Sequence, residues 1–284
     1  MVRKEERGIR RYVHLSTGNY NSSTAKLYTD IGLLSANEDI GQDISDLFNL
    51  LTGFNIFSSD QNYRSAVYPQ FRQIMAAPVD LRDNLLALIE TEIENVKAGE
   101  NGLIIIKANA LVDKQIIDKF YEASTAGVKI QLIIRGICCL KPGIEGLSEN
   151  IEVRSIVDRF LEHSRIYYFF NGGDEKTFLS SADMMPRNMD RRIEIMFPIL
   201  DEASRLRVIN EILDSYWNDN YKGRRLLPDG SYEFVPSEKN SKKVHAQQRL
   251  IELAREQGLK SLPYEKAIWH LSLIHISEPT RLGM

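Results

Sequence analysis

The chain has 284 residues, of which 43% are hydrophobic and 26% are charged, and its formal net charge is −3 at pH 7. These values are typical of a globular protein with one large or two modest domains, and they argue against a general nucleic-acid binder while allowing a local basic groove. The sequence shows no apolar run of membrane-spanning length, no secretory leader and only two cysteines, which are adjacent. A reducing cytoplasm without a disulfide framework is therefore expected.

The first 62 residues are predicted to be part of one domain, and a second domain is expected to run from residue 63 to residue 251. Residues 37–51 should form a helix because apolar residues recur there at helical spacing, at Ile40, Ile44, Leu47 and Leu51. Residues 52–69 are rich in turn formers and are expected to cross between the two domains.

Two helices are predicted near the start of the second domain, over residues 80–98 and 113–126. Each has an aspartate where an N-cap is needed and a glycine just after its end, namely Asp80 with Gly99 and Asp113 with Gly127. The capping residues and the apolar faces between them indicate helices that cover a sheet.

Short apolar runs at residues 103–107 and 128–134 flank the second of these helices and are predicted to be buried strands. Strand, helix and strand at these lengths form a βαβ unit with a parallel pair. Arg135 then follows the carboxyl end of a parallel strand, where open α/β sheets bind ligands. A surface ion pair is the alternative for this arginine. Further strands are expected at residues 151–156, 166–170, 178–181 and 193–197, with closing helices at 201–216 and 241–257.

The segment from Leu161 to Glu194 carries the clearest chemical signal. His163 and Arg165 are two residues apart on an expected strand, so their side chains should share one face. The turn formers at 171–174, Asn-Gly-Gly-Asp, predict a hairpin that returns a Ser-Ser-Ala-Asp segment beside them. Imidazole, guanidinium, hydroxyl and carboxylate groups on one surface suit phosphate chemistry. Packing is the alternative, since a histidine in a strand is more often a packing residue or a surface donor.

A partial internal repeat supports the functional interpretation. Ser16-Thr17-Gly18-Asn19 resembles Ser180-Ser181-Ala182-Asp183, and a carboxylate follows each tetrad at the same spacing, at Asp30 and Glu194. Two copies predict two related half-sites rather than a solenoid. The second copy has its His-x-Arg pair before the tetrad, whereas an equivalent pair in the first copy would precede Met1, because His14 is too close to Ser16. The chain is therefore expected to be truncated within its first domain.

Three strings resemble bacterial polyphosphate kinase of the first type, a family of the phospholipase D superfamily: HLSTGNYNSSTAKLYTD, LVDKQIIDKFYEASTAGVKIQLIIRGICCL and SIVDRFLEHSRIYYFFNGG. The resemblance runs from about Arg3 to about Ile251. It implies an α/β fold with a phospholipase D-like mixed sheet flanked by helices, here with one partial and one near-complete copy. It also implies reversible transfer of the γ-phosphoryl of ATP to polyphosphate through a phosphohistidine.

The resemblance assigns roles to residues of this sequence. Tyr28 in LYTD is similar to the aromatic that stacks on adenine, Arg135 in IIRG to a nucleotide-phosphate contact, and His163 in EHSR to the second catalytic histidine. Possible supporting residues are His14, Asn19, Asp30, Arg165 and Asp183. The phosphorylated histidine of the family lies in a His-x-Lys motif upstream of this chain's first residues, as do its magnesium-linked arginines. No metal ligands are therefore predicted here, and the fragment is expected to be inactive alone.

The implied partners are ATP or ADP, Mg²⁺ and inorganic polyphosphate, without nucleic acid. The parent protein is expected to be a homo-oligomer in the cytoplasm, with peripheral association at the inner membrane. Two other functions stay open. A phospholipase D-type phosphodiesterase would use His-x-Lys, and Arg165 in the lysine position counts against it. A non-catalytic nucleotide- or polyphosphate-binding module is favoured by the missing first motif.

The last residues, 252–284, are expected to be a tail. Residues 272–284 show no continuation of the preceding helical pattern, and they resemble peptide strings translated from sequencing-adapter DNA. We therefore predict that they are not native and exclude them from the expected fold.

Overall fold

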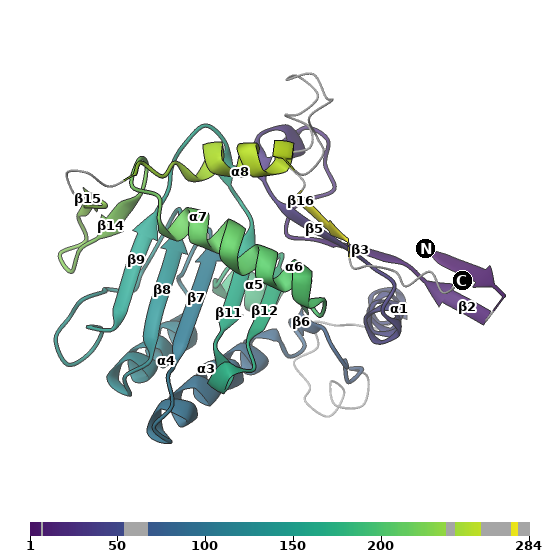
Figure 1. Ribbon diagram of the computed structural model, residues 1–284. Helices are drawn as coiled ribbons and strands as arrows, with labels where there is room; N and C mark the ends of the chain where they lie inside the picture. The colour runs from purple at the N-terminus through teal and green to yellow at the C-terminus, as the bar shows by residue number, and fades with distance from the viewer. Residues whose placement is uncertain (7, 54–67, 237–241, 257–273, 278–284) are drawn as a thin grey trace.

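The computed structural model describes residues 1–6, 8–53, 68–236, 242–256 and 274–277. Its central element is a nine-stranded sheet in the order β15-β14-β9-β8-β7-β11-β12-β13-β6 (Figure 1). In chain order these strands are β6 (Met75–Ala77), β7 (Leu103–Ala108), β8 (Lys129–Ile134), β9 (Ile151–Ser155), β11 (Arg165–Phe169), β12 (Lys176–Ser180), β13 (Glu194–Pro198), β14 (Arg224–Leu226) and β15 (Tyr232–Phe234).

The sheet is mixed, as predicted. β7, β8 and β9 are parallel, and the other neighbouring strands pair antiparallel. The expected βαβ unit is confirmed as β7, α4 (Lys114–Thr125) and β8. The expected hairpin is confirmed as β11 and β12, joined by a turn over Asn171–Gly173 in which all three residues have positive φ. The turn was predicted because asparagine and glycine tolerate positive φ.

Helices cover both faces of the sheet (Figure 1). One face packs on α3 (Leu81–Lys97) and α4, where Leu85 and Phe120 are buried with Tyr167. The other face packs on a continuous helical run and on α8 (Ala246–Glu256), where Ile166 is buried with Val208. That run comprises α6 (Glu202–Arg207), a π-helical segment (Val208–Leu213) and α7 (Asp214–Trp217). The side chains of successive β11 residues therefore pack into the hydrophobic clusters on opposite faces of the sheet, because side chains alternate along a strand.

The two predicted aspartate caps differ in the structure. Asp113 caps α4, because its carboxylate accepts hydrogen bonds from Gln115 N at 3.1 Å and Ile116 N at 3.2 Å. Asp80 precedes α3 but makes no such bond. Its Oδ1 instead accepts from Ala76 N at 2.8 Å, so the side chain closes the turn after β6. Asp80 therefore occupies the predicted N-cap position, but its carboxylate bonds the turn after β6 instead of the first turn of α3.

The first part of the chain forms a smaller unit against the same core. It comprises β1 (Val2–Glu5), β2 (Gly8–Arg11), β3 (Val13–Ser16), a 3-10 turn (Thr24–Lys26), β4 (Tyr28–Thr29), β5 (Ile31–Ser35) and α1 (Glu38–Gly53). β1 and β2 form a hairpin that projects from the molecule (Figure 1). α1 confirms the helix expected over residues 37–51. Leu33 of β5 and Leu47 of α1 belong to the hydrophobic cluster that contains Ile166 and Val208.

The domain boundary predicted near residue 62 lies outside the described residues. Within the described part, backbone pairing joins the two predicted domains, because β4 runs parallel to β10 (Leu161–Glu162). The division at residues 62 and 63 stays a prediction.

One segment of the tail has a place in the structure. β16 (Ile274–Ser277) pairs in parallel with β5, on the side opposite β3. The exposed edge of a strand offers hydrogen-bonding groups to any extended segment, so this pairing does not require a native tail. The non-native origin of residues 272–284 stays a prediction.

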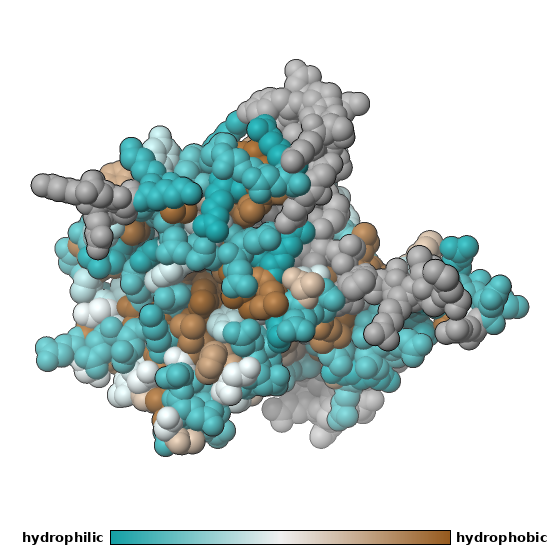
Figure 2. Space-filling view, in the orientation of Figure 1, coloured by the Kyte–Doolittle hydropathy of each residue, from teal (hydrophilic) through white to brown (hydrophobic). Residues whose placement is uncertain are grey.

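Figure 2 shows mostly hydrophilic residues on the face seen in Figure 1, with hydrophobic residues visible below α6 and α7. Among the described helices, none is both long enough and apolar enough to cross a membrane.

Candidate active site

His163 lies where the two parts of the chain meet. β4 and β10 place Tyr28 opposite Leu161 and Thr29 opposite Glu162. His163 directly follows β10, and one residue separates it from β11. The prediction that His163 and Arg165 lie on one continuous strand was therefore wrong. The break has a physical cause. The intervening Ser164 turns its hydroxyl and its carbonyl toward the buried amine of Lys107, at 2.9 and 3.2 Å.

A carboxylate from the first part of the chain holds the imidazole. His163 Nδ1 lies 2.9 Å from Asp30 Oδ1, and both side chains are largely buried. The contact with the Asp30 carboxylate orients the imidazole, while Nε2 lies 3.1 Å from a terminal nitrogen of Arg165. Gly18 makes room for this pair, because a Cβ atom there would lie 2.1 Å from Asp30 Oδ2. The Tyr28 ring lies beside the imidazole, with centroids 4.8 Å apart and planes tilted by 43°.

Arg165 supports the histidine from the other side. Its Nε and one terminal nitrogen donate to the two oxygens of Asp183, at 3.1 and 2.9 Å. Its other terminal nitrogen donates to Thr17 O at 3.0 Å and lies 3.1–3.2 Å from both ring nitrogens of His163. Burial alone would raise the pKa of Asp183, but the Arg165 guanidinium and the hydrogen bonds from Asn109 together hold that pKa below its ordinary value. The two bonds to Asp183 favour a positioning role for Arg165, and a direct phosphate contact stays a prediction.

Arg135 lies at the carboxyl end of β8, as predicted. Its Nε donates to Glu162 O at 2.9 Å and to Asn109 Oδ1 at 3.3 Å. Asn109 follows β7 at the same edge of the sheet, and its Nδ2 donates to Asp183 Oδ1 at 3.1 Å and to His163 O at 3.3 Å. Asn109 therefore connects Arg135 to the histidine. Sequence reasoning missed it, although its position just after a predicted parallel strand was the available signal.

A buried ion pair lies directly behind His163. Lys107 and Glu162 are almost wholly buried, and their Nζ and Oε2 atoms are 3.0 Å apart. The Glu162 carboxylate also accepts hydrogen bonds from Thr29 Oγ1 at 3.1 Å and from Gln247 Nε2 at 2.6 Å. Burial lowers the pKa of Lys107, and the Glu162 charge opposes that shift. Lys107 also lies over the Tyr216 ring, 4.5 Å from its centroid. The pair was missed because a lysine at a strand end is usually solvated.

The echo between the two tetrads is a structural repeat. β3 pairs with β5, and β12 pairs with β13, both antiparallel. Ser16 lies opposite Gly32, and Ser180 lies opposite Met196, so the two pairs share one register.

The repeat extends to the hydrogen bonds. Thr17 Oγ1 donates to Asp30 Oδ1 at 2.8 Å, and Ser181 Oγ donates to Glu194 Oε2 at 2.5 Å. Each hydroxyl oxygen also accepts a bond from the backbone N–H of the residue after that carboxylate, at 3.0 and 3.1 Å. Asp30 and Glu194 are therefore equivalent positions of two copies, as the sequence indicated.

Two candidate residues lie elsewhere in the arrangement. His14 packs against Tyr20, with ring centroids 5.5 Å apart and Tyr20 Oη 2.9 Å from Nδ1. Asn19, the counterpart of Asp183 in the first copy, is exposed. In the part of the chain that the structure describes, no group of three or more His, Cys, Asp or Glu side chains converges to hold a metal ion.

Comparisons with known proteins agree on one family. The models described as polyphosphate kinase C-terminal domain 1 and C-terminal domain 2 match residues 1–56 and 74–247. Polyphosphate kinases from Halalkalibacterium halodurans and Rhodopirellula baltica are 51% and 49% identical over 89% and 88% of this chain, and over 34% and 28% of theirs. The crystal structure of polyphosphate kinase from Porphyromonas gingivalis matches with a TM-score of 0.79 at 38% identity, over 89% of this chain and 37% of that one. The chain thus spans about a third of the length of these relatives.

Proposed function

This chain belongs to the polyphosphate kinase family, and on that premise we propose that it supplies the nucleotide half of a site for reversible phosphoryl transfer between ATP and inorganic polyphosphate. The transfer would pass through a phosphohistidine supplied by the longer protein. The observation that carries the proposal is the contact between His163 and Asp30, because one copy of the repeat contributes the histidine and the other contributes the carboxylate.

His163 acts on the phosphoryl group as a proton donor or a hydrogen-bonding partner. The contact between Nδ1 and Asp30 fixes the orientation of the ring, so that Nε2 and the Arg165 terminal nitrogen 3.1 Å from it would meet a phosphoryl oxygen together. The guanidinium of Arg165 keeps a positive charge close to the ring. Since phosphoryl transfer depends mainly on positioning and on offsetting negative charge, these two groups supply what the reaction needs from this half of the site.

Tyr28 and Arg135 hold the nucleotide in this proposal. Tyr28 is half-buried beside the imidazole, so part of its ring can stack on adenine near the reacting histidine. Arg135 is anchored through Nε to Glu162 O, which leaves its two terminal nitrogens for a phosphate oxygen.

Glu194 extends the proposal to the other half of the site. It occupies the position equivalent to Asp30, and its carboxylate is held by the same kind of hydroxyl bond. By that symmetry, Glu194 would hold the phosphorylated histidine of the longer relatives as Asp30 holds His163.

The remaining features of the proposal are supported only by the resemblance to the family. They are the use of ATP or ADP with Mg²⁺, a cytoplasmic location with peripheral association at the inner membrane, and assembly into homo-oligomers. No residue of this chain is assigned to hold Mg²⁺, and no step is routed through it.

The test measures ATP binding and phosphoryl transfer on the purified chain. Calorimetric titration should show ATP binding that Tyr28→Ala and Arg135→Ala each weaken, whereas the exposed Tyr20→Ala control should bind normally. With γ-labelled ATP and Mg²⁺, no acid-labile label should appear on the chain. Labelled protein would place a nucleophile among these residues, with His14 and His163 as suspects. Absence of ATP binding, or cleavage of a phosphodiester without nucleotide, would refute the proposal.

A further inference from the structure

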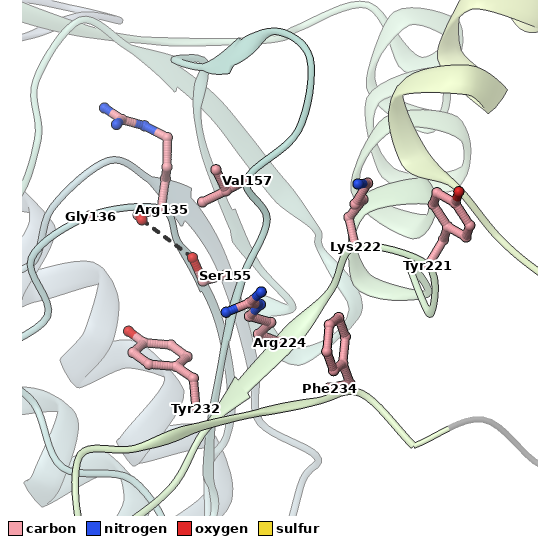
Figure 3. Close-up of a pocket in the computed structure, with 9 residues that line it drawn as sticks. All are labelled: Arg135, Gly136, Ser155, Val157, Tyr221, Lys222, Arg224, Tyr232 and Phe234. Carbon is pink, nitrogen blue, oxygen red and sulfur yellow. Dashed lines mark hydrogen bonds between the residues drawn. The ribbon is translucent and has the colours of Figure 1, made fainter.

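A cavity of about 680 Å³ opens at the end of the sheet that carries Arg135 (Figure 3). Its walls come from the loops after β8 and β9, from the β14–β15 hairpin and from the turn that precedes β14. The lining residues are Arg135, Gly136, Ser155, Val157, Tyr221, Lys222, Arg224, Tyr232 and Phe234. The cavity lies at the carboxyl ends of parallel strands, where α/β sheets bind ligands.

The charge of this cavity selects for anions. Among the described residues that line it, Arg135, Lys222 and Arg224 are cationic and none is a carboxylate. The Arg224 guanidinium lies toward the middle of these residues in Figure 3. A cavity of about 680 Å³ can hold more than one phosphate group, which favours an extended anion over a single ion.

The turn that carries Lys222 is fixed before any ligand binds. The side chain of Asp219 is fully buried beneath it. Asp219 Oδ1 accepts hydrogen bonds from the backbone N–H groups of Tyr221, Lys222 and Gly223, at 2.9, 2.7 and 3.0 Å. Its Oδ2 accepts from Ala246 N at 2.7 Å, which ties the turn to α8. Because these four bonds occupy the carboxylate, the turn presents the lysine on a rigid support.

The aromatic side chains of the cavity hold cations over their rings. The Arg224 guanidinium lies 4.9 Å from the centroid of Phe234. The amines of Lys222 and Lys243 lie 5.5 and 6.0 Å from the centroid of Tyr221. Cation–π contacts of this kind restrain long flexible side chains. The rings of Tyr221 and Phe234 thus act as platforms for cations, which favours an anionic ligand such as a chain of phosphates.

We propose that this cavity binds successive phosphates of an inorganic polyphosphate chain, away from the end that reacts. Arg135 joins it to the candidate active site, because its Nε binds the carbonyl of Glu162, the residue before His163. A chain that runs from the histidine past Arg135 therefore meets Arg224 and Lys222 next. The inference rests on the proposed function and adds a distal subsite to it.

The test compares polyphosphate binding and ATP binding by calorimetry on the same chain. Lys222→Ala combined with Arg224→Ala should weaken binding of long-chain inorganic polyphosphate by at least about tenfold, because two charge-assisted contacts are lost. It should also reduce the salt dependence of that binding and leave ATP affinity unchanged. The matched control is Lys129→Ala with Lys176→Ala, which removes two exposed charges at the ends of the strands opposite the cavity. This control should bind both ligands normally.

The outcomes separate this inference from the proposed function. Equal polyphosphate affinity in the double variant and in the control would overturn the distal subsite, while ATP binding that responds to Tyr28→Ala would still support the proposed function. An equal loss of ATP and polyphosphate binding in the double variant would also overturn the subsite, since the cavity would then hold nucleotide phosphates. Absence of polyphosphate binding to the unsubstituted chain would overturn the subsite as well. Thermal unfolding at the same temperature in all variants checks that the fold is retained.

Discussion

Replacement of Lys107 by methionine should destabilise the fold strongly. Lys107 and Glu162 are 2% and 3% exposed, and their charged atoms are 3.0 Å apart. Methionine is of similar length and restores the buried aliphatic part, so the change mainly removes the charge. Glu162 would keep its bonds from Thr29 and Gln247 but would lose its counter-ion inside the protein.

The expected loss is about 3 kcal/mol of unfolding free energy, the lower end of the range for one partner removed from a buried ion pair, because little cavity is created. Glu162→Gln should rescue Lys107→Met, since the amide is neutral and can still accept hydrogen bonds. The double variant is therefore expected to recover at least half of the loss.

Urea unfolding followed by circular dichroism measures these differences. The control is Lys114→Met, which removes the lysine of an exposed ion pair with Asp118 and should leave the unfolding free energy nearly unchanged. A loss below about 1 kcal/mol for Lys107→Met would mean that the pair behaves like a surface pair. Failure of Glu162→Gln to rescue would mean that packing, rather than the unpaired charge, causes the loss. Either result would refute the reasoning.

Three further predictions rest on other contacts. Gly18→Ala should lower the unfolding free energy by about 1–3 kcal/mol, because its Cβ would lie 2.1 Å from Asp30 Oδ2. Urea unfolding checks this against Gly53→Ala, whose Cβ would meet nothing within 4 Å, and equal stability of the two would contradict it. Asp183 has a folded pKa below its ordinary 3.8, so its contribution to stability is complete above pH 3.8 and is lost as pH falls through the lower folded value. Asp183→Asn should remove this part of the acid dependence, and identical fluorescence-monitored acid titrations of both proteins would contradict that. Residues 1–62 expressed alone should be poorly soluble, because their apolar residues pack against the main sheet and its helices. Soluble protein that unfolds cooperatively would refute this.

Local signals accounted for most of the main sheet. The βαβ unit around α4 and the hairpin at Asn171 were predictable because apolar period, caps and turn residues lie within short segments. The equivalence of the two tetrads was also indicated, since a carboxylate follows each at equal spacing, but the shared strand register was seen only in the structure. The π-helical segment at Val208–Leu213 was not, because its apolar spacing is compatible with an ordinary helix.

The candidate site was predictable in composition but not in its contacts. Tyr28, Arg135 and His163 were named from motifs, and the structure joins Tyr28 to His163 directly and Arg135 to His163 through Asn109. The partner of His163 could not be derived, since Asp30 is 133 residues away in the chain and long-range packing alone brings it close. Lys107 was overlooked because its burial depends on Glu162 and Tyr216, which lie far from it in the sequence.

The crossed contact between the repeats makes the two copies of the repeat depend on each other. Asp30 of one copy holds His163 of the other, and Thr17 of the first accepts a hydrogen bond from Arg165 of the second. Two identical molecules related by a twofold axis would exchange such groups reciprocally, each completing its neighbour. Within a single polypeptide, the same arrangement makes one copy depend on the other for part of its site. Neither copy can then drift independently, because a change in the carboxylate of one alters the histidine of the other.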